Sequence, residues 1–320
     1  MKFSRSKHLL LTALTLSICF LLAAVNENAG TTGFASLKTV HSARALAMGQ
    51  SLTGEAGSPD GLHFNPASIL KMQANEVGST YTNSFVGSQG GQVQFLWPKN
   101  RFTAWGFSLK YMNMGSIERT EMDQNGNLVS TGETFGANNI VASASLAKYI
   151  SDMVDLGGSV KVIYDQIDDK NAAAAMLDLG IMHHPENEKL KVGASVRNLG
   201  FQLNKYSQTG EAEKLPLTFA AGISFRFNPK TMGNLDIGKA TGENIVAKVG
   251  FEYEPYPNLD LRAGFRTNAA DGYTGGFTSI FSGFSLGAGW KWKNYRIDYG
   301  VASYGGLGLQ NQLSLSLALP

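Results

Sequence analysis

Strict alternation of apolar and polar side chains, repeated along most of the chain, is the feature that most constrains its fold. In residues 258–266 and 282–292, for example, nearly every second side chain is apolar and its neighbours are polar or glycine. Successive side chains of a β-strand point to opposite faces, so each such segment predicts a strand with one apolar face. A helix does not fit, because a period of two places polar residues all around it. We therefore expect an all-β protein.

About thirteen segments of this kind follow one another from residue 75 onward. They cover residues 75–83, 90–97, 102–111, 138–149, 154–164, 175–183, 189–198, 217–227, 243–253, 258–266, 282–292, 294–301 and 311–319. A further strand is expected near 128–135 or before residue 60, which would make fourteen. Turn signals such as Asn125-Gly126 and Asp271-Gly272 separate the segments.

Two all-β architectures fit such a series. A soluble β-sandwich would bury the apolar faces in a core, whereas a transmembrane barrel would turn them toward lipid. Segments of about 9–11 residues match a tilted membrane crossing. Aromatic residues lie near the segment ends, as the interfacial girdles of a membrane barrel do, and include Trp97, Trp105, Tyr149, Trp290, Trp292 and Tyr295. These features favour a transmembrane antiparallel β-barrel.

Residues 1–24 are typical of a secretory signal peptide. A positively charged start is followed by an uncharged apolar run to Ala24, and cleavage is expected there or as late as Ala29. An uncleaved anchor is the alternative, although the run is shorter than the ~20 residues that span a bilayer. Cys19 lies within the run, so the mature chain has no disulfide. Without the leader, 24 basic and 25 acidic residues remain, which argues against nucleic-acid binding.

Residues 25–74 differ from the rest of the mature chain. Residues 40–74 alternate poorly and are rich in small residues, glycine and proline. A polar, irregular segment is tolerated at membrane depth only where protein encloses it. We therefore expect residues 25–74 to form a hatch or plug in the lumen and residues 75–320 to form an outer-membrane barrel. A periplasmic extension is the alternative.

Three sequence blocks resemble those of PorV/PorQ-type proteins, within the wider FadL-like group of outer-membrane barrels. The first is SARALAMG at 42–49 followed by DGLHFNPA at 60–67, the second is VRNLG at 196–200, and the third is LRAGFRTN at 261–268. Their order along residues 40–319 carries the resemblance. The chain departs from the pattern at Ser68-Ile69, where Gly-Leu is usual, and at its end, which lacks a terminal aromatic residue.

The resemblance implies a fourteen-stranded barrel with an internal hatch, and two alternative roles. PorV-type members serve the type IX secretion system, so the first expectation is a non-catalytic component of protein export to the cell surface. In FadL-like transporters the hatch and a strand kink guide hydrophobic molecules sideways into the membrane, so the alternative is uptake of fatty acids or other hydrophobic compounds. The implied partners are outer-membrane lipid, secretion-system proteins or exported substrates, and hydrophobic small molecules.

Seven residues of the expected hatch are candidates for holding or gating it: Arg44, Met48, Gly49, Asp60, Asn65, Pro66 and Ala67. Arg44 is the one charge in a stretch of small apolar residues, and once enclosed it requires a carboxylate such as Glu55 or Asp60. In Asn65-Pro66-Ala67 the proline fixes φ and the asparagine side chain can form an Asx turn. A structural role for this turn is the first expectation, and control of a lateral exit is the alternative.

A second candidate surface is the apolar loop that contains Phe277, Ile280 and Phe281. Such a loop is either a docking surface or a lip that dips into lipid.

The sequence offers no motif for catalysis, for a metal or for a cofactor. His183 and His184 are adjacent, so on a strand they point to opposite faces, and an exposed loop tip is expected for them. The run Asp123 to Asn127 lacks the ligand spacing and the glutamate of a calcium loop. We therefore expect a protein that is not an enzyme.

Overall fold

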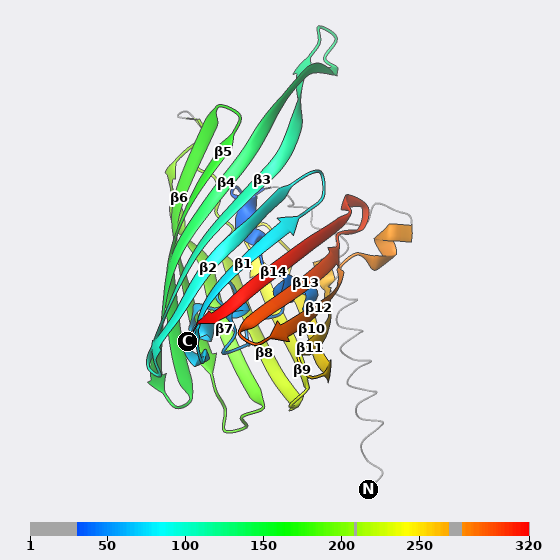
Figure 1. Ribbon diagram of the computed structural model, residues 1–320. Helices are drawn as coiled ribbons and strands as arrows, with labels where there is room; N and C mark the ends of the chain where they lie inside the picture. The colour runs from blue at the N-terminus through cyan, green and yellow to red at the C-terminus, as the bar shows by residue number, and fades with distance from the viewer. Residues whose placement is uncertain (1–30, 208–209, 269–276, 320) are drawn as a thin grey trace.

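The computed structural model describes residues 31–207, 210–268 and 277–319. In this part of the chain fourteen antiparallel strands close into a barrel (Figure 1). The all-β barrel predicted from the alternation is thereby confirmed, as is the number of strands. The strands are β1 (Asn75–Asn83), β2 (Gln89–Asn100), β3 (Thr103–Met122), β4 (Leu128–Ser151), β5 (Val154–Ile167), β6 (Lys170–His183), β7 (Leu190–Asn204), β8 (Thr218–Asn228), β9 (Thr231–Ala240), β10 (Val246–Tyr256), β11 (Leu259–Arg266), β12 (Phe284–Trp292), β13 (Tyr295–Ser303) and β14 (Leu309–Leu319).

Each strand pairs with its sequence neighbours, and β1 pairs with β14 to close the sheet. The closing ladder runs from the pair Asn75 and Leu319 to the pair Asn83 and Asn311. Closure satisfies the backbone hydrogen bonds of both terminal strands, which an open sheet edge within lipid would leave unpaired.

One strand differs from the sequence-based expectation. The pattern does not predict β9, and it places the additional strand wrongly, because residues 128–135 belong to β4. The outward face of β9 carries Leu235 and Ile237 between Gly233 and Lys239, while the inward positions include Asn234 and Asp236. Two apolar residues give too weak an alternation to be recognised beside the stronger segments.

The outer wall is apolar, whereas the lumen is largely polar. On β2, Val93, Phe95 and Trp97 are exposed, while Gln92 and Leu96 are buried inside. The same alternation recurs around the barrel, and it is the arrangement expected of a wall in contact with lipid.

The two ends of the barrel have different connections. At one end, which we call the turn end, two-residue turns such as 101–102, 152–153 and 229–230 join the strands. The opposite loop end carries longer connections, among them 205–217 and 241–245. At the loop end β3 and β4 continue as a paired hairpin beyond both of their neighbours, as Figure 1 shows.

Residues 31–74, which we call the N-terminal segment, lie inside the barrel (Figure 1). The segment contains η1 (Ala35–Lys38), α2 (Ala43–Ala47), η2 (Pro59–Gly61) and η3 (Pro66–Lys71). Helix α2 packs against β11–β14, whereas η3 packs against β2–β6. The segment therefore contacts strands on most of the circumference. The expected signal peptide lies outside the described residues.

No helix among the described residues is long and apolar enough to span a membrane.

Candidate functional site

Arg44 lies at the centre of a buried ion-pair cluster that joins the N-terminal segment to the wall. Its Nη1 is 2.7 Å from Glu55 Oε1, and its Nε is 2.8 Å from Glu252 Oε2 on β10. Asp60 Oδ2 lies 3.7 Å from the same guanidinium. Both carboxylates that the sequence suggests as partners are therefore within ion-pair distance, and Glu252 adds a third from the wall. An enclosed charge requires such partners, because its desolvation is otherwise uncompensated.

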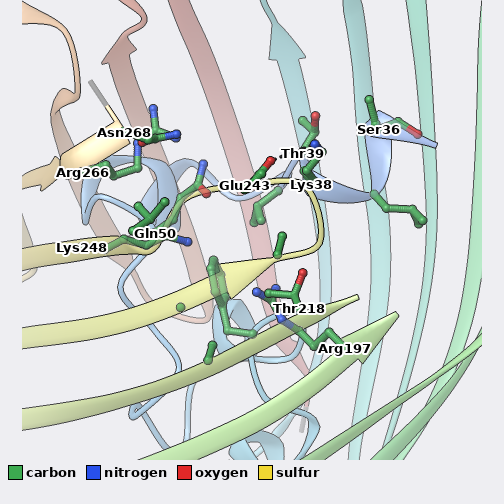
Figure 2. Close-up of a pocket in the computed structure, with 18 of the residues that line it drawn as sticks. Ser36, Lys38, Thr39, Gln50, Arg197, Thr218, Glu243, Lys248, Arg266 and Asn268 are labelled. Carbon is green, nitrogen blue, oxygen red and sulfur yellow. Dashed lines mark hydrogen bonds and ion pairs between the residues drawn. The ribbon is translucent and has the colours of Figure 1, made fainter. Parts of the chain in front are cut away.

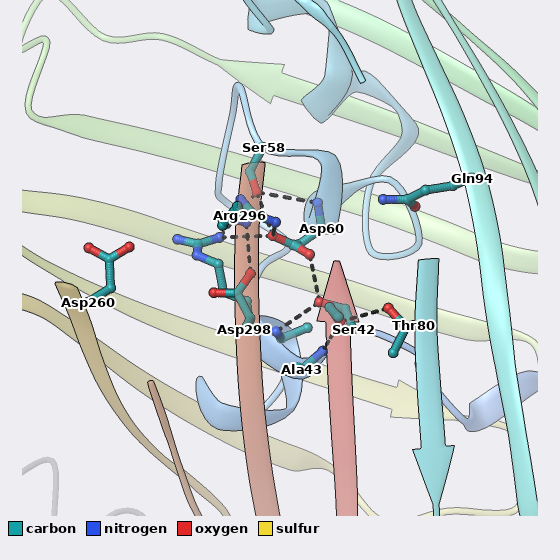
Figure 3. Close-up of polar contacts among 12 residues, drawn as sticks. Ser42, Ala43, Ser58, Asp60, Thr80, Gln94, Asp260, Arg296 and Asp298 are labelled. Carbon is teal, nitrogen blue, oxygen red and sulfur yellow. Dashed lines mark hydrogen bonds and ion pairs between the residues drawn. The ribbon is translucent and has the colours of Figure 1, made fainter. Parts of the chain in front are cut away.

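Asp60 continues this cluster toward β13, as Figure 3 shows. Its carboxylate accepts a hydrogen bond from Ser42 Oγ (2.7 Å) and lies 2.8 Å from Arg296 Nη2. Burial opposes ionisation of Asp60, but the positive charges of Arg296 and Arg44 outweigh it and hold the pKa of this carboxyl below its usual value. Ser42 also caps α2 by accepting a hydrogen bond from Ala45 N.

Met48 and Gly49 place the end of α2 directly against the wall. Gly49 has a φ of 62°, in the left-handed region that favours glycine. Its backbone lies so close to Gly264 of β11 that a Cβ at position 264 would collide with Gly49 N. The Met48 side chain is buried in an apolar cluster with Leu52 and Phe64.

Asn65, Pro66 and Ala67 form the expected Asx turn, which begins η3. Asn65 Oδ1 accepts a hydrogen bond from Ala67 N (3.1 Å), and Asn65 Nδ2 donates to Ile181 O of β6 (2.9 Å). A Cβ at Gly180 of β6 would collide with Asn65 Oδ1. The turn is thus seated against the wall at a position where only glycine leaves room.

The seven predicted residues consequently fall in two places, the ion-pair cluster with the end of α2, and the Asx turn. All seven are buried and contact the wall or the remainder of the segment. None of them lines the cavity described next. Their role in gating stays a prediction.

A cavity of about 410 Å³ lies at the loop end of the lumen, and residues 35–40 of the N-terminal segment form part of its lining (Figure 2). Apolar side chains from the segment and from the wall form much of its lining, and include Leu37, Val40, Phe64, Phe85, Met112, Met114 and Val246. A cavity of this size accommodates a small organic molecule.

Three cations of this cavity lack a carboxylate partner. Arg197 on β7, Lys248 on β10 and Arg266 at the end of β11 all line it. Within the described chain, no carboxylate oxygen lies within 4.0 Å of these three side chains. In contrast, Lys38 in the same cavity is 2.8 Å from Glu243. The cavity therefore combines an apolar lining with three cations that form no ion pair.

Phe64 of the N-terminal segment lies between two of these cations. The guanidinium of Arg197 is 5.7 Å from the centre of the Phe64 ring, and Lys248 Nζ is 6.0 Å from it. Such cation–π contacts compensate only part of the desolvation of a buried cation. Asp236, which also lines the cavity, accepts a hydrogen bond from Thr53 N (2.8 Å) and thereby faces the segment.

The outer face of the wall has a hollow of about 590 Å³ beside this cavity. Its lining is almost wholly apolar and includes Leu156, Leu179, Ile181, Val196, Phe219, Ile237 and Ile245. Ala220, Ile237, Gly238 and Lys239 line both the hollow and the cavity. Ala220 and Gly238 pair directly across β8 and β9, so only the smallest side chains separate the two spaces at this point.

The strand next to the hollow is irregular. The register of β6 and β7 shifts between Leu177 and Leu179, and Asn198 has a φ of 61°. The ladder between β7 and β8 ends at the pair Arg197 and Thr218, whereas the ladder between β6 and β7 continues to Asn204. Above this point β7 is therefore held by β6 and by the 205–217 connection rather than by β8.

Polar contacts stabilise the β-bulge at Asn198. Asp178 Oδ1 accepts a hydrogen bond from Asn198 N and lies 2.7 Å from Lys161 Nζ on β5. Asn198 Nδ2 donates to Pro216 O in the 205–217 connection (3.0 Å). The bulge is thereby fixed to strands on one side and to the connection on the other.

The remaining sequence candidates lie apart from the cavity. Ile280 and Phe281 belong to η5 (Phe277–Phe281) and are exposed, whereas the side chain of Phe277 lies outside the described part of the structure. The expectation of an exposed loop tip for His184 is wrong, because its ring is buried and lies 2.6 Å from Asp155. Among the described residues, no three His, Cys, Asp or Glu side chains converge as metal ligands.

The three cavity cations are site residues that no sequence motif indicates. Arg197, Lys248 and Arg266 each occupy an inward position of a strand whose outward face is apolar. A charge at such a position is a usable signal, because in a barrel it must face the lumen.

No protein-family model matches the sequence, and neither does any curated protein sequence. Solved structures do match the fold. The toluene transporter TbuX of Ralstonia pickettii has a TM-score of 0.60 at 15% identity, over 91% of this chain and 100% of that one. The toluene transporter TodX of Pseudomonas putida gives 0.58 at 13% identity, over 86% and 96% of the two chains. A FadL homologue of Pseudomonas aeruginosa gives 0.57 at 12% identity, over 87% and 98%. The fold is therefore that of FadL-type Gram-negative outer-membrane barrels.

Proposed function

We propose that the protein is an outer-membrane channel for the uptake of hydrophobic small molecules, and not an enzyme. One observation carries the proposal: a cavity inside the lumen and an apolar hollow on the outer wall share Ala220, Ile237, Gly238 and Lys239. A molecule held in the cavity is thus separated from the lipid-facing surface by a thin part of the wall.

The lining of the cavity indicates the class of molecule. An apolar body would pack against Val40, Phe64 and Met112, while an anionic head group would meet Lys248 and Arg266. A charge-assisted hydrogen bond to such a head group would compensate cations that have no carboxylate partner in the described chain. Hydrophobic acids such as fatty acids fit this combination better than hydrocarbons do.

The proposed route begins at the loop end and leaves sideways. The N-terminal segment fills the lumen beneath the cavity and is tied to the wall by the Arg44 cluster and the Asx turn. Movement along the barrel axis would require this packed segment to be displaced. Exit through the wall beside Ala220 and Gly238 would instead require only a local change, because the β7–β8 ladder ends at Arg197 and Thr218, two residues beyond Ala220.

The structural neighbours support a transport role in general terms. TodX and TbuX are described as toluene transporters, and they share the fold of this chain. The export role implied by the PorV/PorQ resemblance finds no comparable support among these neighbours or in the described contacts. We therefore place uptake ahead of export.

Uptake by cells tests the proposal. The chain is expressed in a strain that lacks its own outer-membrane route for fatty acids, and the initial rate of labelled dodecanoic acid uptake is measured. We expect expression to raise this rate. An unchanged rate, with the folded barrel present in the outer membrane, would contradict the proposed function.

A further inference from the structure

Three cations cluster at the turn end of the barrel, around the start of β3. Lys99 lies near the end of β2, Arg101 lies in the β2–β3 turn, and Lys148 lies near the end of β4. All three are exposed. We call these three residues the turn-end patch.

The sheet register places the three residues of the patch close together. Asn100 pairs with Thr103 across the β2–β3 turn, and Thr103 pairs with Lys148 on the other side of β3. Neighbouring strands lie about 4.8 Å apart, so Lys99 and Lys148 are separated by roughly 10 Å on either side of β3. Their spacing suits one shared anionic group better than two independent ones.

None of the three cations of the patch forms an ion pair within the described chain. No carboxylate oxygen there lies within 4.0 Å of Lys99, Arg101 or Lys148. Asp152, in the adjacent β4–β5 turn, instead accepts a hydrogen bond from the hydroxyl of Tyr149 (2.7 Å).

An aromatic surface lies directly beside these cations, on the outer wall. Trp97 and Trp105 form a cross-strand pair, and the rings of Trp105 and Phe107 are stacked with centroids 6.4 Å apart. Lys99 Nζ lies 5.9 Å from the Trp97 ring, and the Arg101 guanidinium lies 4.5 Å from the Phe102 ring. Cations beside interfacial tryptophans are positioned at the level of lipid head groups.

We propose that the turn-end patch is a binding site for an anionic glycerophospholipid. The phosphate would lie among Lys99, Arg101 and Lys148, and an acyl chain would lie along Trp97, Trp105 and Phe107. In outer-membrane barrels the short turns face the periplasm. The lipid available at this end is therefore a glycerophospholipid of the inner leaflet rather than lipid A, and an anionic head group complements the charge of the patch.

Native mass spectrometry of the delipidated, folded protein tests this site. The probes are palmitoyl-oleoyl phosphatidylglycerol and the zwitterionic phosphatidylcholine with the same chains. Wild type should retain the phosphatidylglycerol preferentially, and the variant K99Q/R101Q/K148Q should retain at least about fivefold less of it.

The matched control is K189Q/R226Q/K230Q, which removes the same three charges elsewhere on the turn end. That sector also contains Glu186 and Glu188, so its net charge is lower than that of the turn-end patch. The control should bind phosphatidylglycerol as wild type does. Equal losses in both variants, equal retention of the two lipids by wild type, or stronger retention of lipid A than of phosphatidylglycerol would overturn the proposal.

Discussion

Arg44 Nε of α2 and Glu252 Oε2 of β10 lie 2.8 Å apart, although 208 residues separate them in the sequence. The contact connects the centre of the N-terminal segment to the wall in a buried environment. Arg262 extends the same network, because its guanidinium lies 2.6 Å from both Glu252 and Asp298. Ion pairs that cross from the segment to the wall, Arg44 with Glu252 and Asp60 with Arg296, thus fix the position of the segment in the lumen.

Replacing Arg44 should loosen the segment. Arg44→Met leaves Glu55 without its ion-pair partner and Glu252 with Arg262 alone, and breaking a buried ion pair in this way costs about 3–5 kcal/mol. We expect the variant to show ion conductance in planar bilayers that wild type lacks. Arg119→Met, which breaks an exposed pair in the projecting hairpin, is the control and should behave as wild type does. Equal conductance of all three proteins would show that Arg44 does not hold the segment.

The close contact between the Asx turn and Gly180 predicts how a substitution there changes the stability of the protein. Gly180→Ala would place a methyl group against Asn65 and should lower the free energy of unfolding by roughly 1–3 kcal/mol, as overpacking does. Gly158→Ala on the neighbouring strand is a matched control, because a Cβ there meets no atom closer than 3.7 Å. Urea unfolding of the two variants measures the difference, and equal midpoints would contradict the proposed fit.

Buried His41 predicts that acid destabilises the packed segment. Burial and, secondarily, Lys110 lower the pKa of His41 to about 3, so the folded protein keeps the ring neutral where the unfolded chain binds a proton. Stability should therefore be complete above pH 6.5 and fall as the pH decreases toward 3, by at most ~1.4 kcal/mol per pH unit from this residue.

The variant His41→Gln isolates this contribution, since glutamine does not titrate and can still hydrogen-bond to Thr82. Urea midpoints at pH 7.5 and pH 4.5 should differ less for the variant than for wild type. An identical pH dependence of the two proteins would exclude His41 as its source.

Much of this fold follows from the sequence for a simple reason. A wall between lipid and a polar lumen imposes a period of two on each strand, and segments such as 258–266 show it without interruption. The pattern does not predict strand β9, because Leu235 and Ile237 are the only large apolar residues on its outward face. The proximity of Arg44 to Glu55 and Asp60 also follows from the sequence, because the three charges are close along the chain.

The cavity could not be predicted in the same way. Arg197, Lys248 and Arg266 lie on three different strands, and only closure of the barrel and the local register bring them to one end of the lumen. The bulge at Asn198 depends on a contact with Asp178, twenty residues away in the sequence. Alternation determines which face a side chain occupies, but not its height along the barrel relative to a distant strand.

The cavity cations without an ion pair predict that the protein binds hydrophobic acids more tightly than the corresponding alcohols. Lys248→Met should weaken binding of dodecanoate about tenfold, because one charge-assisted contact is lost. Binding of dodecanol, which lacks the charge, should change little. Isothermal titration in detergent measures both ligands, and Lys205→Met, which removes a lysine that does not line the cavity, is the control. A similar loss for dodecanol would show that Lys248 supports the cavity structurally and does not recognise the head group.

On the proposed route, ligand leaves the lumen through the thin wall at Ala220 and Gly238. The direct measurement is the initial rate of dodecanoic acid uptake by cells that make wild type, Ala220→Phe or Ala144→Phe. Ala144→Phe is the control, because it places the same ring on the lipid-facing side of β4. We predict that Ala220→Phe slows uptake by about tenfold, which corresponds to ~1.4 kcal/mol of obstruction, while Ala144→Phe leaves it unchanged. Uptake by Ala220→Phe at the wild-type rate, at equal amounts of folded barrel, would contradict the lateral route.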